Sequence, residues 1–360
     1  MKFNDNNKST IKGKRLNITV FGSSHQNKIG VKVKGLKGET FSIDKLNEFM
    51  QRRRAKATAY STKRIELDKP EFIKGVEGGK IIGDTFIAVI RNSKKKSADY
   101  SKLYKIPRPS HADYVAYTKY GDGYDYRGGG KFSGRLTAPM CIVGGIAKQI
   151  LEKKGIKVNA FISSIGSENG KSYSDLPLDY NYSFLDENFP VIEGEDAKKM
   201  LSLIKSTAKE GDSVGGKIDC VITGVPVGVG EYMFDSLEGI ISRLAFAVPA
   251  VKGIEFGEGF KITEKLGSEA NDQFYFDNGI VKTKTNNNGG INGGISNGMP
   301  ITFRVAIKPT PSIYKEQETV NLITGENVKV KIEGRHDACI VPRAVAVIEA
   351  IASIAILDLL

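Results

Sequence analysis

Three histidines are the only imidazoles in this 360-residue chain, and each lies in a turn-like segment beside small or acidic residues. His25 follows two serines, His111 precedes Asp113 by two positions, and His336 precedes Asp337 directly. Imidazole donates or accepts a proton near neutral pH, so this placement favours acid–base chemistry over a structural role. The same residues could instead bind a metal, but no pair has a familiar ligand spacing. We therefore expect no metal site.

A cluster of glycines and cations follows His111 in the stretch RPSHADYVAYTKYGDGYDYRGGGKFSGRLTA. Residues 128–130 are glycines, which leave backbone N–H groups free to face a flat or anionic ligand. Lys131 and Arg135 add positive charge directly after them. The alternative is a surface loop with a solvated histidine, because glycine and charge runs are common in loops.

The chain carries a net charge of +12 at pH 7 and is 40% hydrophobic, so it can bury a large core and present a basic surface. Positive charge favours an anionic partner, and composition alone leaves nucleic acid, an acidic membrane surface and a phosphorylated small molecule open. A nucleic-acid-binding protein would bind with a steep salt dependence. The motifs favour the small molecule, so we expect neither nucleic acid nor a membrane as the partner.

Cysteine usage and the chain ends indicate a cytoplasmic protein. Cys141, Cys220 and Cys339 each lie in an apolar run, which predicts buried thiols in a reducing compartment and no disulfide framework. The N-terminus lacks the apolar segment of a signal peptide. Charged residues interrupt the apolar segment that begins at residue 340, which favours a buried or subunit-facing helix over a membrane span.

Hydrophobic periodicity predicts alternating strands and helices in one α/β (α+β) unit. Residues 31–46 and 220–237 resemble each other, because each contains an apolar strand, a glycine turn and the start of a helix. This echo predicts two halves related by pseudo-symmetry. We expect a flexible N-terminal tail over residues 1–14 and a single catalytic domain over 15–360. The expected strands are 15–22, 29–33, 158–165, 217–223 and 301–307, with a hairpin over 72–92 and a basic loop over 93–106. The expected helices are 136–151, 196–209 and 235–247, one that begins at Ser42, and one that follows Pro342.

The asparagine–glycine loop at 286–298, NNNGGINGGISNG, lies between expected core strands, so we interpret it as a ligand-wrapping loop. A flexible linker is the alternative. The loop also contains the Gly-x-Ser-x-Gly pattern of serine hydrolases around Ser296, but it lacks the preceding strand and the following helix. A standard phosphate-binding loop is absent from the sequence, since no GxxxxGK[ST] occurs and residues 128–133 break GxGxxG at its last position.

Nine motifs occur in the order found in chorismate synthases and span residues 15–360: FGSSH, RRRAKATA, RPSHADY, KYGDGYDYRGGGKFSGRLTA, DSVGG, AVKGIEFGEGF, GGINGGISNGMPI, KPTPSI, and GRHD followed by VPRAVAVIEA. The chain resembles this family. The resemblance implies a β-α-β sandwich, a homotetramer, and a lyase of the shikimate pathway, which leads to aromatic amino acids. The implied reaction converts 5-enolpyruvylshikimate-3-phosphate to chorismate and phosphate by anti-1,4-elimination with reduced FMN and no net redox change. NADPH is the implied reductant where flavin reduction is built into the enzyme.

Carried over by position, the resemblance implies that His25 protonates the departing phosphate and that His111 lies near the flavin pyrimidine ring. Asp337 would assist proton removal through the flavin, and Arg53 and Arg135 would bind substrate or NADPH. A dianionic substrate and an anionic reduced flavin need several cations, which the basic balance of the chain provides. The positions that fall where the family holds FMN are Lys131, Phe132, Ser133, Pro249, Ala250, Gly293, Lys308, Pro309, Thr310, Pro311, Ser312 and Arg335. The apolar helices over 136–151 and after Pro342 are candidates for the subunit interface.

Several positions depart from the family pattern. We expect Phe132, which replaces a small hydroxyl residue, to crowd or stack on the flavin ring. The departures leave two hypotheses, an active but divergent enzyme and a family member with altered or lost activity. The other departures are Ser23 and Gln26 in the family's GESHG, Ser110 for the glycine of RPGHAD, Leu136 in RSSARET, Ala59 for an arginine of the NADPH-linked site, and Ala270 for a histidine.

Overall fold

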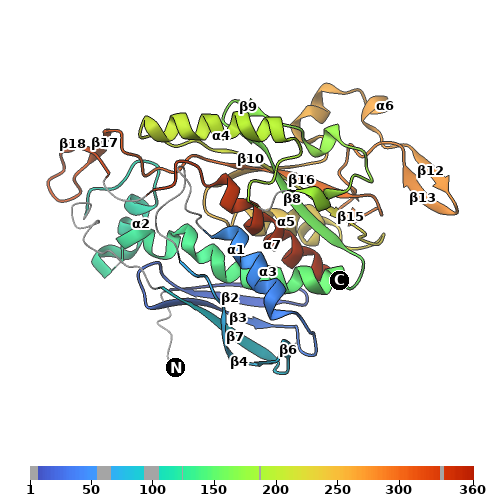
Figure 1. The fold of residues 1–360 in the computed structure, drawn as a ribbon, viewed down its shortest axis with the longest axis horizontal. Helices are drawn as coiled ribbons and strands as arrows, with labels where there is room; N and C mark the ends of the chain where they lie inside the picture. Colours follow the sequence, from blue (N-terminus) through green and yellow to red (C-terminus); the bar gives the residue numbers. More distant parts are fainter. Residues whose placement is uncertain (1–6, 55–65, 93–104, 124, 186–187, 333–335) are drawn as a thin grey trace.

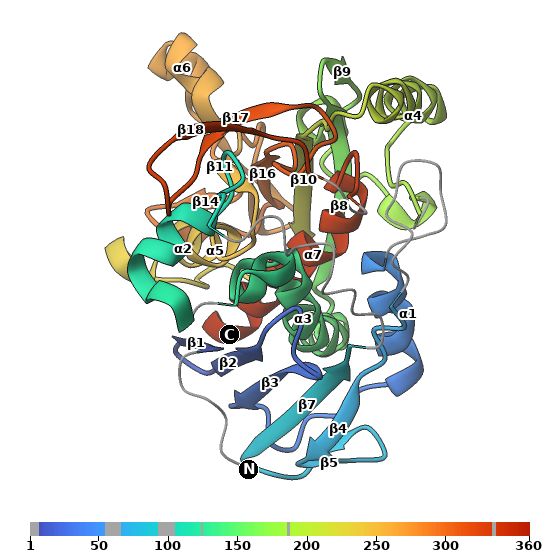
Figure 2. The same ribbon diagram turned by 90° about the vertical axis from the view of Figure 1, so that its left-hand side faces the viewer.

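Two five-stranded antiparallel sheets enclose a layer of helices in this protein, as its computed structural model shows (Figure 1). The structure describes residues 7–54, 66–92, 105–123, 125–185, 188–332 and 336–360. Figure 2 shows one sheet on each side of the central helices. The expected α+β sandwich of the form β-α-β is therefore confirmed.

The first sheet is built from the N-terminal quarter of the chain, and its strand order is β1-β2-β3-β7-β4. Alternate residues of the middle strand, Ile29, Val31 and Val33, are fully buried, as a half-buried strand of period two requires. Strands β2 and β3 form a hairpin whose last pair is Gly22 with Ile29, so the turn between them carries His25. The strands are β1 (Lys8–Lys12), β2 (Asn17–Gly22), β3 (Lys28–Lys34), β4 (Glu71–Lys74) and β7 (Thr85–Arg91).

The second sheet has the order β11-β16-β10-β8-β9 and uses strands that lie between residues 157 and 307. Helix α4 (Gly194–Lys209) contacts its β8–β9 edge and lies outside the central helix layer (Figure 2). The strands are β8 (Lys157–Ile165), β9 (Glu168–Asn169), β10 (Gly216–Thr223), β11 (Val251–Phe256) and β16 (Ile301–Ile307).

The two halves repeat one pattern, as the sequence echo predicts. Strands β3 and β10 are the middle strands of their sheets, and each ends before a glycine with positive φ, Gly35 at 99° and Gly224 at 81°. A Cβ on Gly35 would lie 2.0 Å from the carbonyl oxygen of Arg15, so only glycine fits this turn. A serine N-cap then starts a central helix in each half, Ser42 for α1 (Ile43–Arg53) and Ser236 for α5 (Leu237–Ala245).

The helix layer forms the hydrophobic core between the sheets. Helices α3 (Thr137–Glu152) and α7 (Val341–Leu359) pack against each other closely, because a Cβ on Gly144 would lie 2.2 Å from the Cβ of Ala350. Almost every side chain of α7 is buried, including those of its charged residues Glu349 and Asp358. The expectation that these two apolar helices form a subunit interface is therefore wrong, since their apolar faces are used within one chain.

The N-terminus is more ordered than expected. Residues 8–12 form strand β1 and pair with β2 along its whole length, so the predicted flexible tail does not extend over them. The carboxylate of Asp358 in α7 accepts backbone N–H groups of Lys14, Arg15 and Leu16 at 2.6–3.1 Å. The start of the chain is thereby tied to its last helix, because these contacts satisfy backbone donors that would otherwise be buried alone.

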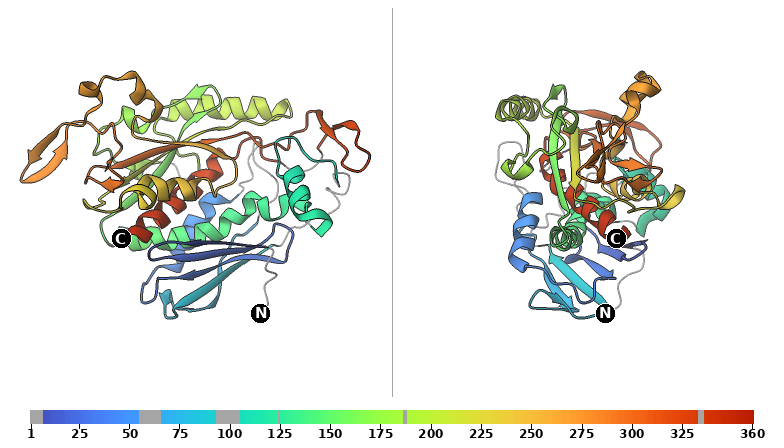
Figure 3. Two further views of the ribbon diagram at one scale, coloured as in Figure 1. Left: turned by 180° about the vertical axis from the view of Figure 1, so that it is seen from behind. Right: turned by 90° about the vertical axis from the view of Figure 1, so that its right-hand side faces the viewer.

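Small hairpins and short helices lie outside the two sheets and the central helix layer. The predicted hairpin over 72–92 is present as β4 and β7 with a smaller hairpin inside it, whereas the predicted basic loop lies mostly outside the described residues. One hairpin, β12–β13, projects from the body of the molecule (Figure 3). No helix in the described part of the chain is both long and apolar enough to cross a membrane. The elements are β5 (Val76–Glu77), β6 (Lys80–Ile81), α2 (Asp113–Tyr120), α6 (Gly267–Ala270), β12 (Phe274–Asp277), β13 (Ile280–Thr283), β14 (Ile291–Asn292), β15 (Ile295–Ser296), β17 (Gln317–Val320) and β18 (Asn327–Val330).

Candidate functional site

A run of three glycines brings two of the histidines together. Gly128, Gly129 and Gly130 all have positive φ, between 53° and 80°, a region that side chains other than glycine rarely adopt. A Cβ on Gly128 would lie 2.4 Å from Cε1 of His25, and one on Gly129 would lie 3.3 Å from Nε2 of His111. The bare backbone of one short segment therefore contacts both imidazoles, which are 86 positions apart in the sequence.

The His25 turn connects β2 to β3 and is held against the glycine run. The backbone N–H of Ser24 donates to the carbonyl oxygen of Gly130 at 3.2 Å, and its hydroxyl donates to the carbonyl oxygen of Arg127 at 3.0 Å. The same hydroxyl lies 3.2 Å from Nδ1 of His25. The His25 side chain is buried at the end of the first sheet. Of the two departures from the family pattern here, Ser23 is buried and Gln26 is exposed.

His111 is held by an acid and an arginine. Its Nδ1 lies 2.7 Å from Oδ1 of Asp113, at the start of α2, and 3.1 Å from Nη2 of Arg108. Burial lowers the pKa of His111, the charges of Arg108 and Lys308 lower it further, and Asp113 opposes them. Burial also opposes ionisation of Asp113, yet hydrogen bonds from His111 and Arg108 hold the pKa of its carboxyl well below the usual range. The preceding Ser110 adopts a positive φ of 57°.

Arg108 is a site residue that the sequence reasoning missed. Its Nε and Nη2 donate to the two carboxylate oxygens of Asp113 at 2.7 and 2.9 Å, and its Nη1 donates to the hydroxyl of Ser312 at 3.1 Å. This buried guanidinium therefore joins the His111 segment to the 308–312 segment from the other half of the chain. The arginine is visible next to the proline and histidine of the motif, but its partner 204 positions away is not.

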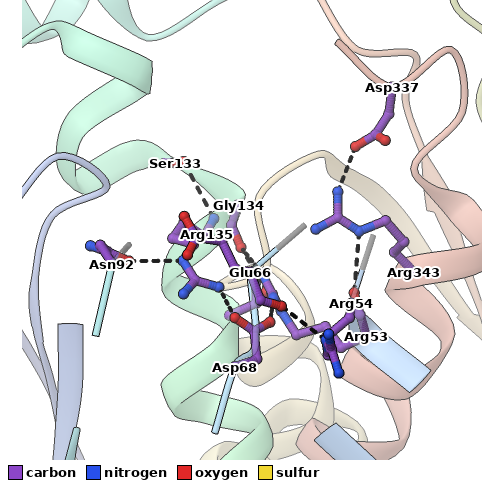
Figure 4. A network of polar contacts seen from close by, with 11 residues as sticks. Arg53, Arg54, Glu66, Asp68, Asn92, Ser133, Gly134, Arg135, Asp337 and Arg343 are labelled. Atoms are coloured by element: carbon purple, nitrogen blue, oxygen red, sulfur yellow. Dashed lines mark hydrogen bonds and ion pairs between the residues drawn. The ribbon is translucent and has the colours of Figure 1, made fainter. Parts of the chain in front are cut away.

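A buried cluster of two arginines and one aspartate lies where α1 meets α3 (Figure 4). Arg53 donates to Oδ2 of Asp68 at 2.7 Å, to the hydroxyl of Thr137 at 2.8 Å and to the carbonyl oxygen of Gly134 at 3.0 Å. Arg135 donates from Nη1 to the other carboxylate oxygen of Asp68. Burial lowers the pKa of Arg53 to about 10, although Asp68 opposes this shift.

The cluster has an excess of positive charge and one unused donor. Two guanidinium groups share the single carboxylate of Asp68, and all three side chains are at least nine-tenths buried. Nη2 of Arg135 is buried and has no hydrogen-bond partner among the residues that the structure describes. Arg53, by contrast, uses Nε, Nη1 and Nη2 on protein groups. An anion would satisfy Arg135 and balance the charge of the cluster.

Asn92 connects this cluster to the His25 turn. Its Oδ1 accepts from Nε of Arg135 at 3.0 Å (Figure 4), and its Nδ2 donates to the carbonyl oxygen of Gln26 at 2.9 Å. Asn92 and Asp68 were both missed from the sequence, because nothing in their neighbourhoods indicates which distant groups they contact.

Asp337 reaches the same cluster through Arg343. Nη1 of Arg343 donates to Oδ2 of Asp337 at 2.6 Å, while its Nε donates to the carbonyl oxygen of Arg53 at 3.2 Å (Figure 4). The hydroxyl of Thr310 donates to the backbone oxygen of Asp337 at 3.1 Å. His25, His111 and Asp337 therefore all belong to one connected set of contacts. His336 packs its ring 5.9 Å from that of Tyr314, and Arg343 is a further residue that sequence reasoning missed.

The cationic segment after the glycine run faces an aromatic ring. The Lys131 ammonium lies 3.3 Å from the ring centroid of Tyr120 in α2, and the partly exposed Phe132 ring lies 6.4 Å from that ring. Ser133 accepts the backbone N–H of Arg135 at 3.3 Å and so caps the short helix that precedes α3. Lys131 and Phe132 thus stand on the open side of the glycine run.

The other positions expected to hold FMN fall into two groups. Lys308 donates to the carbonyl oxygen of Ser110 at 2.7 Å, and the backbone N–H of Lys308 donates to Ala250, whose φ is 76°. The structure therefore brings the 308–312 segment, with Thr310 and Ser312, to His111. Gly293 lies in the turn between β14 and β15, where a Cβ would meet no atom within 4 Å. Pro249, Pro309 and Pro311 have no polar contact through their side chains, and Arg335 and Ala59 lie outside the described residues.

Ser296 contradicts the serine hydrolase alternative. Its hydroxyl is buried, donates to the carbonyl oxygen of Pro226 at 2.6 Å and accepts the backbone N–H of Val229 at 2.9 Å. The residue lies in strand β15, and β16 follows, so the strand–turn–helix of a nucleophile elbow is missing. The 286–298 loop is not a linker either, since the buried Asn287 donates its backbone N–H to Asp272 at 2.7 Å.

Two imidazoles contact one glycine run, next to a cluster with surplus positive charge, on a β-α-β sandwich. The sequence model of chorismate synthase matches residues 16–360, and the chain belongs to the chorismate synthase family. Members of this family are carbon–oxygen lyases of the shikimate pathway. This membership argues against the nucleic-acid interpretation of the charge.

Individual relatives give the same result. The chain is 42% identical to chorismate synthases of Dehalococcoides mccartyi, over 96% of this chain and 95% of the relative, and of Thermococcus gammatolerans, over 97% and 96%. A crystal structure of a chorismate synthase matches with a TM-score of 0.73 at 27% identity and covers 97% of this chain and 92% of the other. The family pattern has glycine where this chain has Ser110. The backbone of Ser110 adopts the left-handed conformation, which glycine adopts most readily, and this accounts for the glycine of the family.

Proposed function

We propose that this protein is an active chorismate synthase, which converts 5-enolpyruvylshikimate-3-phosphate to chorismate and phosphate by anti-1,4-elimination. The observation that carries the proposal is the contact of His25 and His111 with one glycine run, beside the guanidinium of Arg135, whose buried Nη2 has no hydrogen-bond partner among the described residues. An elimination of this kind needs a proton for the departing phosphate, a cation to hold it and a group that removes a ring hydrogen.

His25 is the proposed acid toward the phosphate, and Arg135 is the proposed phosphate ligand. Arg135 keeps a buried donor without a protein partner, whereas Arg53 has committed its three donor nitrogens. We therefore assign direct anion binding to Arg135 and a supporting role to Arg53 through Asp68. Asp337, held by Arg343 at 2.6 Å, is the proposed proton acceptor.

Reduced FMN is the proposed cofactor, and the residues present fit it. Burial and the charge of the neighbouring Lys252 lower the pKa of Lys308, so two ammonium groups lie close together and would be relieved by an anion. Lys308 through Ser312, Lys131 through Ser133, Pro249, Ala250 and Gly293 would hold the flavin and its phosphate, and His111 would face its ring. When bound, reduced FMN supplies the electron density that assists loss of phosphate.

We also propose that NADPH can reduce the flavin, that the protein is a homotetramer and that it acts in the cytoplasm. Reduction of the flavin by NADPH would be detected as NADPH oxidation under anaerobic conditions. Three free, buried cysteines are consistent with a reducing compartment such as the cytoplasm. The exposed aromatic side chains of the β12–β13 hairpin, Phe274 and Phe276, support association between chains, because monomers rarely expose such a patch. Light scattering would report a tetramer.

Phosphate release from 5-enolpyruvylshikimate-3-phosphate tests the activity directly. The assay uses photoreduced FMN under anaerobic conditions, and the wild type is expected to form chorismate and phosphate in equal amounts. His25→Asn and Arg135→Gln are expected to lose most of the rate, with FMN binding retained. A folded wild type that binds FMN and substrate but releases no phosphate would favour the alternative, a family member with altered or lost activity.

A further inference from the structure

Asn92 is the side chain that joins the His25 turn to the arginine cluster. It follows the last residue of β7 directly and is buried. Nδ2 donates to the carbonyl oxygens of Gln26 at 2.9 Å and Ser23 at 3.4 Å, while Oδ1 accepts from Nε of Arg135 at 3.0 Å. The backbone N–H of Asn92 donates to Asn27 at 3.0 Å. One amide therefore contacts both the turn and the guanidinium.

These contacts fix the direction of the unused Arg135 donor. The guanidinium is planar, so two constrained N–H groups set the direction of the third. Asn92 constrains Nε and Asp68 constrains Nη1, and the remaining Nη2 is the buried group without a partner. Without Asn92, the guanidinium could rotate about the single contact with Asp68.

The same amide is a second attachment of the His25 turn. Ser24 bonds the turn to the carbonyl oxygens of Arg127 and Gly130, and Asn92 bonds it to the end of β7. The turn is thus held by two elements, and Asn92 is the side chain that bonds it directly to the Arg135 guanidinium.

We propose that Asn92 is a positioning residue for the elimination: it sets the relative position of Arg135, which holds the phosphate, and His25, which gives that phosphate a proton. This inference rests on the proposed function. The proton moves from His25 to a phosphate oxygen as the carbon–oxygen bond breaks, and Asn92 itself exchanges no proton. Misplacement of reacting groups by about 1 Å can cost on the order of a hundredfold in rate.

Two substitutions separate the two halves of the amide. Asn92→Asp keeps an acceptor for Arg135 but has no N–H for the turn, so we expect kcat to fall about tenfold or more while KM changes by less than about threefold. Asn92→Ala loses both contacts, so we expect an equal or larger loss of kcat together with a raised KM. The control is Asn321→Ala, whose side chain braces the backbone of Ile323 in the β17–β18 turn at 2.9 Å and should leave both constants unchanged.

A second measurement needs no turnover. The chain has only three histidines, so the Cε1–H resonances of selectively labelled histidines can be assigned by substitution. Asn92→Ala and Asn92→Asp are expected to shift the His25 resonance and to leave that of His336 in place. An unchanged His25 resonance in both variants would overturn the proposal, as would a loss of kcat that matches the loss of folded protein. A wild type without phosphate release would instead count against the proposed function alone.

Discussion

The two imidazoles depend on residues that have no side chain. Gly128 lies so close to His25 that a Cβ would come within 2.4 Å of the ring, and its φ of 57° already excludes most residues. The requirement is therefore both steric and conformational. The glycine run that the sequence suggested for binding a ligand also serves to pack two histidines side by side.

Gly128→Ala is expected to displace His25 and to lower kcat by tenfold to a hundredfold, by the order-of-magnitude cost of a misplaced acid. The matched control is Gly78→Ala in the turn between β5 and β6, because Gly78 has a similar φ of 53° but no atom within 4 Å of its Cβ position. Both variants pay the left-handed backbone cost of roughly 1 kcal/mol in unfolding free energy. Equal kcat values in the two variants would contradict the packing role of Gly128.

His111 is expected to take up a proton when an anion binds. Burial, Arg108 and Lys308 hold the pKa of His111 below its usual value, so its imidazole is mainly neutral at pH 7 in the free protein. An anionic ligand favours the imidazolium and raises that pKa, so binding at pH 7 should be accompanied by a net uptake of protons. Affinity should therefore fall as the pH rises.

Calorimetry of reduced FMN binding in buffers of different ionisation enthalpy measures this uptake. Asp113→Asn removes the carboxylate 2.7 Å from His111, so the pKa of His111 should fall further and the uptake should shrink. A binding enthalpy that is independent of the buffer, in the wild type, would rule out the proton-linked role of His111.

At the scale of elements, one aspartate holds together α1, α3 and the segment before α3. Asp68 accepts from Arg53 at the end of α1 and from Arg135 just before α3, and Arg53 also bonds Thr137 at the start of α3. Neither arginine has another carboxylate in its described contacts. The ends of these elements are therefore joined by charge rather than by apolar packing.

Asp68→Asn is expected to lower the free energy of unfolding by about 3–5 kcal/mol, because it leaves two buried guanidiniums without their counter-charge. Urea unfolding followed by circular dichroism measures the change. Asp84→Asn is the control, since Asp84 pairs with Lys37 at 2.9 Å on the surface, where both side chains are mostly exposed. Stability equal to that of the control would contradict the role of Asp68.

At the scale of the whole molecule, the buried Glu349 links three helices of the central layer to the second sheet. Its carboxylate in α7 accepts from Arg52 of α1 at 2.8 Å, from Lys148 of α3 at 2.9 Å and from the backbone N–H of Ala160 in β8 at 3.1 Å. Burial opposes its ionisation, but Lys148 and Arg52 prevail and lower the pKa of Glu349 to about 2. The ionised carboxylate is thus part of the native core.

Glu349 makes the fold sensitive to acid. A carboxyl with a depressed pKa stabilises the native state fully above its unfolded pKa, which is about 4.5 for Glu349. For a native pKa of about 2, this stabilisation is about 3 kcal/mol. It is lost as the pH falls from about 4.5 to about 2. Glu349→Gln should lower stability at pH 7 and flatten its decline below pH 4.5. Urea titrations at several pH values test this, with the exposed Glu195→Gln as control. A decline as steep as that of the wild type would disprove it.

The sequence by itself determined the family motifs, the central helices, both middle strands and the candidates His25, His111 and Asp337, but not β1, α2, β11 or the hairpins β12–β13 and β17–β18. Strand periodicity, glycine turns and the serine caps Ser42 and Ser236 are local features, so the central helices and both middle strands were predicted close to their observed bounds. The echo between the halves was also visible, because each half repeats the same local pattern around Gly35 and Gly224. These features could be predicted because each depends on residues that are close together in the sequence.

Tertiary structure alone decided which partners these groups have. Arg108 contacts Ser312, Arg135 contacts Asn92, and Arg343 contacts Arg53, across 204, 43 and 290 positions. It also decided that the apolar helices α3 and α7 face each other and not a second subunit, and that residues 8–12 complete a sheet. These contacts form only when the two sheets and the helix layer pack together, because each buried charge or apolar face is matched by a segment far away in the chain.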